Sequence, residues 1–175
     1  MVAGDHPLMK EVLAVCEYCG CQALDAIAEL TAEHDAVVEL GGEARRALDR
    51  GDLDHAADRA RAIATVLRPH TAVEEEALFP AMAAEYPSHV ARLVADHRRI
   101  EQVLTESAAG TPSDEAWPAR LAHALTDLRE HILREQDGVF PAALISLDNE
   151  QWDALAAARA RVASGASVPV EGRPR

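Results

Sequence analysis

The segment 70–81 reads HTAVEEEALFPA, and the segment 131–142 reads HILREQDGVFPA. In both segments a glutamate stands four residues after the histidine, and Phe-Pro-Ala follows at the same distance. The two His–Glu pairs are His70 with Glu74 and His131 with Glu135. Because residues four apart lie on one face of an α-helix, each segment predicts a helix that directs an imidazole and a carboxylate toward one point.

Two more histidines repeat in step with these segments. His34 lies in the triplet EHD and His97 in the triplet DHR, and the step between them exceeds the step from His70 to His131 by only two residues. The chain therefore looks like one helical hairpin used twice. A pseudo-two-fold axis between the hairpins would bring the four histidines to roughly one level in the core.

Apolar residues recur with the helical period along most of the chain, so the sequence predicts an all-α fold. Helices are expected at about 22–48, 54–85, 89–107, 113–145 and, shorter than the others, 148–162. The expected N-caps are an aspartate of the turn 50–54, Ser88 and Ser113. Pro80 and Pro141 should kink the second and fourth helices or re-route their last turns. Short loops favour an antiparallel up-down-up-down four-helix bundle with a short extra C-terminal helix.

The predicted bundle domain spans residues 22–163 and is preceded by an N-terminal arm, residues 1–21. The tail, residues 164–175, is expected to be disordered because it is rich in Gly, Ser, Pro and charge. The arm holds three cysteines, Cys16, Cys19 and Cys21. An odd number of thiols does not suggest a disulfide framework, so a metal-binding or redox role and simple packing both remain open.

The formal net charge of -13 argues against nucleic acid or an anionic membrane surface as a partner. No apolar run is long enough to cross a membrane, and the first residues lack the pattern of a signal peptide. The sequence therefore predicts a cytoplasmic protein without nucleic-acid or membrane partners. It does not indicate an oligomeric state.

The inward histidines and glutamates indicate bound metal. Buried imidazoles and carboxylates are costly unless they are paired or coordinate an ion. Two ions would satisfy them, since a carboxylate can bridge two metals and an imidazole cannot. Glu74 and Glu135, one in each repeat, are the expected bridges, and the four histidines are the expected terminal ligands. Mixed imidazole and carboxylate ligation suits iron or manganese, with zinc as a substitute.

This ordered ligand pattern resembles the haemerythrin-like (HHE cation-binding) family, and within it a bacterial branch with two His-x-x-x-Glu elements. The pattern consists of His34, His70, Glu74, His97, His131 and Glu135. The resemblance covers about residues 22–160. It implies a four-helix bundle around a non-haem di-iron centre, oxo- or hydroxo-bridged, and it assigns the ligand roles to these six residues.

Glu101 stands where the oxygen-carrying members of that family have a fifth histidine. We treat it as a seventh candidate metal ligand; the alternatives are a hydrogen-bonding role beside the ligands and an exposed charge next to Arg98 and Arg99. If Glu101 binds, the ion of His97 and His131 gains a ligand and the other ion keeps an open position. An anionic ligand favours the ferric state, so the sequence predicts consumption of oxygen or peroxide rather than reversible oxygen carriage.

Four residues beside the predicted ligands have structural interpretations. Phe79 and Phe140 are expected to be core residues that wall the site. Glu75 and Glu76 are expected on the solvated face of the second helix, with ligation by Glu75 as the alternative.

Together these features predict a di-iron oxidoreductase that carries out oxygen- or peroxide-dependent redox chemistry. It would be an oxidase of a small metabolite or a peroxide scavenger. Two alternatives remain: a module that binds or senses oxygen, nitric oxide or iron without turnover, and a helical protein that no longer binds metal. The sequence does not identify an organic substrate.

Overall fold

The computed structural model describes residues 25–165, which are mostly helical and contain no β-strand. The all-α prediction is therefore confirmed for this part of the chain. The predicted arm at 1–21 and residues 166–175 of the predicted tail lie outside the described residues. The elements in order are α1 (Asp25–Asp49), α2 (Leu53–Val73), the π-helical turn η3 (Glu74–Leu78), α3 (Phe79–Ala83), α4 (Pro87–Thr105), α5 (Trp117–Arg134), the π-helical turn η4 (Glu135–Val139), α6 (Phe140–Ser146) and α7 (Asn149–Ala163).

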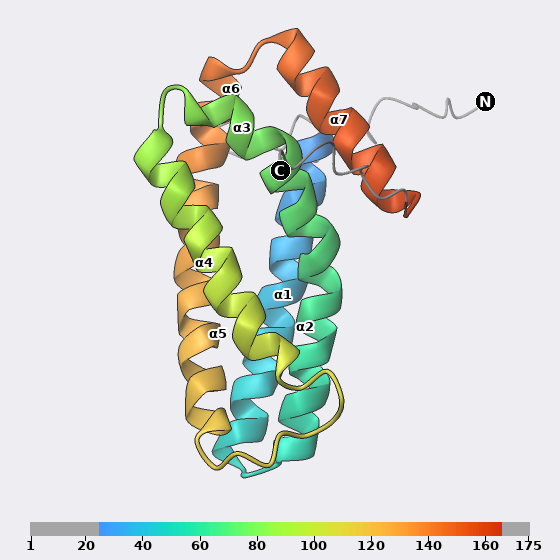
Figure 1. Cartoon of the computed structure of the whole chain (residues 1–175), viewed down its shortest axis with the longest axis vertical. Helices are drawn as coiled ribbons and strands as arrows, with labels where there is room; N and C mark the ends of the chain where they lie inside the picture. Colours follow the sequence, from blue (N-terminus) through green and yellow to red (C-terminus); the bar gives the residue numbers. More distant parts are fainter. Residues whose placement is uncertain (1–24, 166–175) are drawn as a thin grey trace, which may run out of the picture.

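Four long helices, α1, α2, α4 and α5, lie side by side (Figure 1). Helix α1 packs against α2 and α5, and α4 packs against the same two helices. The colours of Figure 1 run down α1, up α2, down α4 and up α5. Helices α3, α6 and α7 gather at the upper end of this view, where α7 packs against η3, α2 and α1. None of the described helices is long and apolar enough to cross a membrane.

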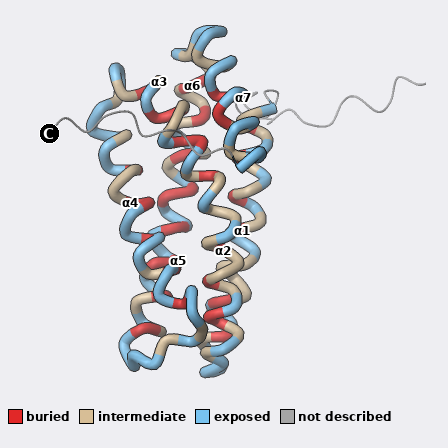
Figure 2. Tube along the Cα trace, turned by 45° about the vertical axis from the view of Figure 1, so that its right-hand side comes forward, coloured by how far each residue is buried: buried red, intermediate tan, exposed pale blue. Residues whose placement is uncertain are grey.

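The apolar core is divided into two clusters with a polar layer between them. The cluster near the α1–α2 turn includes Val37, Ile63 and Trp117, and the cluster toward α7 includes Leu30 and Phe79. On α1, α2 and α4 the buried histidine stands in sequence between residues of the two clusters. On α5 His131 stands among residues of the first cluster, and Phe140 of the second cluster follows beyond η4. Figure 2 shows the buried stretches alternating with exposed ones along these helices. The core therefore fixes the height of the polar layer through packing above and below it.

Helix starts agree with the sequence only in part. Asp52 is the N-cap of α2, and its carboxylate accepts a hydrogen bond from the backbone N–H of His55 at 3.2 Å. The predictions for Ser88 and Ser113 are wrong, because α4 begins at Pro87 and α5 at Trp117. Both helices have proline in the first turn, where its missing N–H costs no helical hydrogen bond.

Candidate metal centre

The polar layer consists of four histidines and two glutamates, one or two from each long helical segment. They are His34 on α1, His70 on α2, Glu74 at the start of η3, His97 on α4, His131 on α5 and Glu135 at the start of η4. All six side chains are buried. The structure therefore brings together six of the seven residues that the sequence singled out as candidate ligands.

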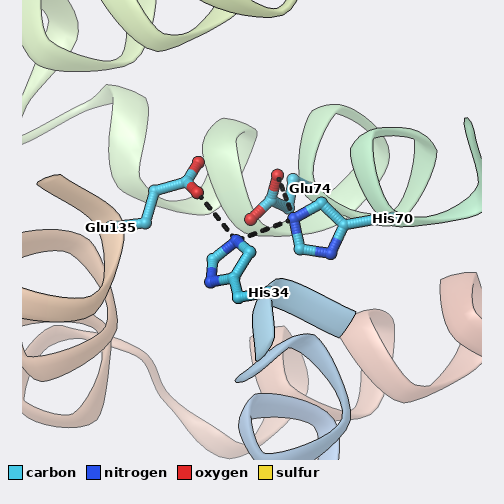
Figure 3. Close-up of side chains that lie close together, drawn as sticks. All are labelled: His34, His70, Glu74 and Glu135. Carbon is cyan, nitrogen blue, oxygen red and sulfur yellow. Dashed lines mark hydrogen bonds and ion pairs between the residues drawn. The ribbon is translucent and has the colours of Figure 1, made fainter. Parts of the chain in front are cut away.

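These residues form two groups that share both glutamates. One group is His34, His70, Glu74 and Glu135, and the other is Glu74, His97, His131 and Glu135. In each group the four potential ligand atoms lie within 4.8 Å of one another. Figure 3 shows the first group, with the two carboxylates and the two imidazoles facing a common centre. Each group offers four donors of the types that hold a metal ion, two imidazoles and two carboxylates.

Glu135 has one oxygen for each group. Its Oε2 lies 3.1 Å from His34 Nε2, and its Oε1 lies 3.0 Å from His131 Nε2. Glu74 Oε2 stands between the groups, 3.3 Å from His70 Nε2 and 3.4 Å from His97 Nε2. Each carboxylate thus contacts one histidine of each group.

Several of these buried polar atoms have no hydrogen-bond partner within the described part of the chain. Both oxygens of Glu74 and of Glu135 are in this condition, as are Nε2 of His97 and Nε2 of His131. In addition, Nε2 of His34 and Nε2 of His70 face each other at 3.0 Å. Buried polar groups without partners cost free energy, and one cation in each group would satisfy all of them. The residues therefore fit a metal pair.

Two of the four outward Nδ1 nitrogens, those of His70 and His97, lie at hydrogen-bond distance from carboxylates, of which the sequence suggested only Glu75, as an alternative ligand. His70 Nδ1 lies 2.9 Å from Glu33 Oε2, and His97 Nδ1 lies 2.8 Å from Glu75 Oε1. Asp96 lies 3.8 Å from His131 Nδ1 through its Oδ2. A carboxylate at hydrogen-bond distance fixes the tautomer of a metal-binding imidazole and directs its Nε2 lone pair inward, so Glu33 and Glu75 are placed for this role and Asp96 is too far away.

Two of these three carboxylates carried a signal in the sequence. Glu33 and Asp96 each directly precede the first histidine of a repeat. Glu75 is exposed, as expected from its place on the solvated face, yet it contacts a histidine of the layer.

The charges of the layer are coupled in the metal-free protein. Burial disfavours a proton on His97, but its close contact with Glu74 and the negative charge there outweigh burial and raise its pKa to about 9. Burial likewise opposes protonation of His70, but the charge of Glu74 and the hydrogen bond that His70 donates to Glu33 outweigh it and raise the pKa of His70. Burial would raise the pKa of Glu135, but its contacts with His131 and His34 hold it below the ordinary value. Protons therefore occupy positions that metal cations would take, and metal binding must release them.

The two π-helical turns begin at the two shared glutamates. The backbone N–H of Phe79 bonds to the carbonyl of Glu74, and that of Phe140 to the carbonyl of Glu135. Pro80 and Pro141 follow directly and have no N–H for an α-helical bond. The sequence predicted a kink or a re-routing at the prolines; the structure shows one wide turn before each, a feature that often marks functional sites.

Phe79 and Phe140 wall the layer on its α7 side, as predicted. Each is 1% exposed. Phe140 stacks on His34 with ring centroids 5.6 Å apart, and Phe79 stacks on His97 at 5.4 Å. Each phenylalanine thus packs on a histidine of the other hairpin and keeps water from that face.

The opposite side of the layer opens into a pocket of about 290 Å³. All four histidines line it, and aliphatic side chains such as Leu67, Ile100 and Leu128 form its walls. Glu101 also lines this pocket, but it is exposed and belongs to neither tetrad. Arg98 lies beside it in the lining.

Comparison with known proteins agrees with the ligand pattern. A family model described as "Hemerythrin HHE cation binding domain" matches residues 25–143, from the first residue of α1 into α6. No curated protein and no solved structure matches the chain. The match covers well over half of the sequence and includes both tetrads. The chain therefore belongs to the hemerythrin HHE cation-binding family.

Proposed function

We propose that the protein is a non-haem di-iron oxidoreductase that uses oxygen or peroxide. Metal binding follows from the family, whose typical metal is iron, and from the His–Glu clusters. The number of ions, the redox chemistry and the substrate are our proposal. The observation that carries it is the pair of tetrads that share Glu74 and Glu135.

In this proposal each ion has two histidines of its own and the two bridging carboxylates. His34 and His70 hold the first ion, and His97 and His131 hold the second. Imidazole and carboxylate donors suit iron, and manganese and zinc are substitutes. Iron in such a site supplies Lewis acidity and one-electron redox chemistry.

The pocket supports a reaction with a small molecule at this centre. Its floor is the four-histidine layer and its walls are aliphatic, while Arg68, Arg98, Glu75 and Glu101 line it as well. A volume of about 290 Å³ is close to the lower limit of ordinary ligand pockets, so a small metabolite fits beside the layer. This favours the oxidase over the peroxide scavenger.

Metal ligation by Glu101 stays a prediction from the sequence. Its exposed position in the lining supports a different role, in which it meets a molecule that enters the pocket. The proposal therefore rests on six ligands, and it places oxygen, peroxide or nitric oxide and a small organic molecule on the pocket side of the layer.

We further propose that the four long helices form the antiparallel up-down-up-down bundle and that residues 22–163 are one domain. The alternating directions of α1, α2, α4 and α5 and their mutual packing support this. The equivalent contacts of the two hairpins support a pseudo-two-fold axis through the layer. Cytoplasmic location stays a prediction from the sequence.

The experiment loads metal-free protein with ferrous iron without oxygen, counts the iron, then admits oxygen and finally degasses. We expect two irons per chain, oxidation by oxygen, and no return of the ferrous spectrum after degassing. Glu74→Ala and Glu135→Ala should each lose the two-iron stoichiometry. Glu130→Ala, an exposed glutamate on α5, is the matched control and should keep it.

Two results would contradict the proposal. One is an iron content of one or less per chain in folded wild-type protein under these conditions. The other is full recovery of the ferrous spectrum on degassing, which would favour the alternative of a module that binds or senses oxygen without turnover. Screening small metabolites for loss of oxygen then separates an oxidase from a peroxide scavenger, which consumes added peroxide without an organic substrate.

A further inference from the structure

We propose that Arg159 of α7 is a positioning residue for the first metal ion, acting through Glu33 on His70. The inference rests on the proposed metal pair and adds a part of the chain that the family match does not include. Helix α7 spans Asn149–Ala163, whereas the match ends at residue 143. One of its arginines nevertheless reaches the polar layer through a single carboxylate.

The contacts form a continuous chain from α7 to the ligand. Arg159 Nη1 donates to Glu33 Oε1 at 2.7 Å, and Nη2 donates to Glu33 Oε2 at 3.1 Å. The same Oε2 lies 2.9 Å from His70 Nδ1. Arg159 Nε lies 3.1 Å from Glu29 on the preceding turn of α1, and the Arg159 side chain is only 17% exposed. Two elements far apart in the sequence are thus joined beside the site.

This geometry fixes the orientation of the Glu33 carboxylate as well as the position of α7. A guanidinium that grips both oxygens of a carboxylate holds its plane as well as its position. The carboxylate of Glu33 then accepts the Nδ1–H of His70, so the Nε2 lone pair of His70 faces the tetrad. Without Arg159, Glu33 is free to turn toward solvent, because it is already about one quarter exposed. The imidazole would then lose its fixed tautomer and orientation.

The second hairpin is supported differently, so the two metal positions are not equivalent. There Asp96 pairs with Arg134 of α5 and Arg99 of α4, both within the family match. Its distance to His131 Nδ1 is 3.8 Å, longer than a hydrogen bond. Loss of Arg159 should therefore weaken the binding of one ion and leave the binding of the other unchanged.

Arg161 provides a matched control on the same helix. It pairs with Glu76 in η3, so it also ties α7 to the bundle. Glu76, however, belongs to neither tetrad. Removing the Arg161 charge thus costs another ion pair of α7, a more exposed one, without touching the chain of contacts to His70.

The experiment titrates metal-free protein with cobalt(II) and follows the visible ligand-field bands and the bound stoichiometry. Cobalt is a spectroscopic probe for mixed imidazole and carboxylate sites. In Arg159→Gln we expect one of two cobalt ions to bind roughly 10–100-fold more weakly, the usual cost of losing such a supporting contact, with its bands altered. Arg161→Gln should bind both ions like the wild type. Arg159→Lys, which keeps the charge but not the fork, should fall between.

Glu33→Gln provides the decisive cycle, because Arg159 is proposed to act only through Glu33. In the double variant Glu33→Gln/Arg159→Gln, the affinity for the more weakly bound cobalt ion should be no lower than in Glu33→Gln alone. Additive losses, or equal affinities in Arg159→Gln and Arg161→Gln, would overturn the inference. Glu33→Gln with both cobalt affinities unchanged would overturn it even if an Arg159 variant failed to fold. Wild-type protein that binds fewer than two cobalt ions would instead contradict the proposed metal pair. Failure of the proposed function is thereby distinguished from failure of the Arg159 inference.

Discussion

Raising the pH should destabilise the metal-free protein, because protonated histidines offset the negative charge of the buried glutamates in the polar layer. The pKa of His97 is raised from 6.5 to about 9 in the folded protein. A histidine whose pKa is raised on folding contributes its full stabilisation below the pKa of the unfolded state. That stabilisation is lost as the pH rises through the pKa of the folded state. The loss therefore falls between pH 6.5 and about 9. At about 1.4 kcal/mol per unit it amounts to about 3 kcal/mol. His70, whose pKa is also raised, adds in the same direction.

The assay is urea unfolding in the presence of a chelator, followed by far-ultraviolet circular dichroism at pH 6.5 and pH 9.5. We expect the unfolding free energy to fall by about 3 kcal/mol over this interval. His97→Gln should remove most of this dependence. His123→Gln changes an exposed histidine on α5 and should retain it.

The metal-loaded protein should show the opposite trend, because ligands must lose their protons before they bind an ion. Its stability should rise with pH over the range in which the metal-free form becomes weaker. Metal-free stability that stays constant or rises from pH 6.5 to 9.5 would contradict a stabilising proton on His97. So would an undiminished loss in His97→Gln.

Three other substitutions test the ligand set, access through the pocket and the N-cap of α2. Glu101→Gln should leave two irons per chain by metal analysis, since six other residues form the tetrads; loss of an iron would instead support its role as a ligand. Ala64→Phe places a ring in the pocket lining, so azide, a small exogenous anion, should bind the iron-loaded protein more weakly in a spectroscopic titration, while unchanged affinity would contradict access through this pocket. Asp52→Ala removes the N-cap of α2 and should lower the unfolding free energy by about 1 kcal/mol in urea, with the iron content unchanged; a larger loss accompanied by loss of iron would show that the cap affects the site.

The six-residue layer could be predicted because its determinants are local and repeated. Glu74 stands one helical turn after His70, and Glu135 stands one turn after His131. That spacing fixes a common direction on a helix whatever the rest of the chain does. The repeat then relates the two halves without any knowledge of the loops.

The supporting contacts could not be predicted because they depend on how distant helices meet. Arg159 is separated from Glu33 by 126 residues, and no sequence period connects them. Glu75 resembles any exposed helical glutamate until α4 brings His97 beside it. Pro80 signalled a disturbance of the helix, but its form depended on packing of the neighbouring Phe79 in the core.

X-ray absorption at the iron edge of fully loaded protein tests for two irons that share Glu74 and Glu135, because it detects one metal next to another. The shared oxygens of Glu74 and Glu135 predict an iron–iron distance below about 4 Å, with nitrogen and oxygen as the nearest neighbours. Two irons per chain with that short vector, lost together in Glu135→Ala, is the expected result. Iron without an iron neighbour, in protein shown to hold two irons per chain, would contradict the shared-carboxylate centre.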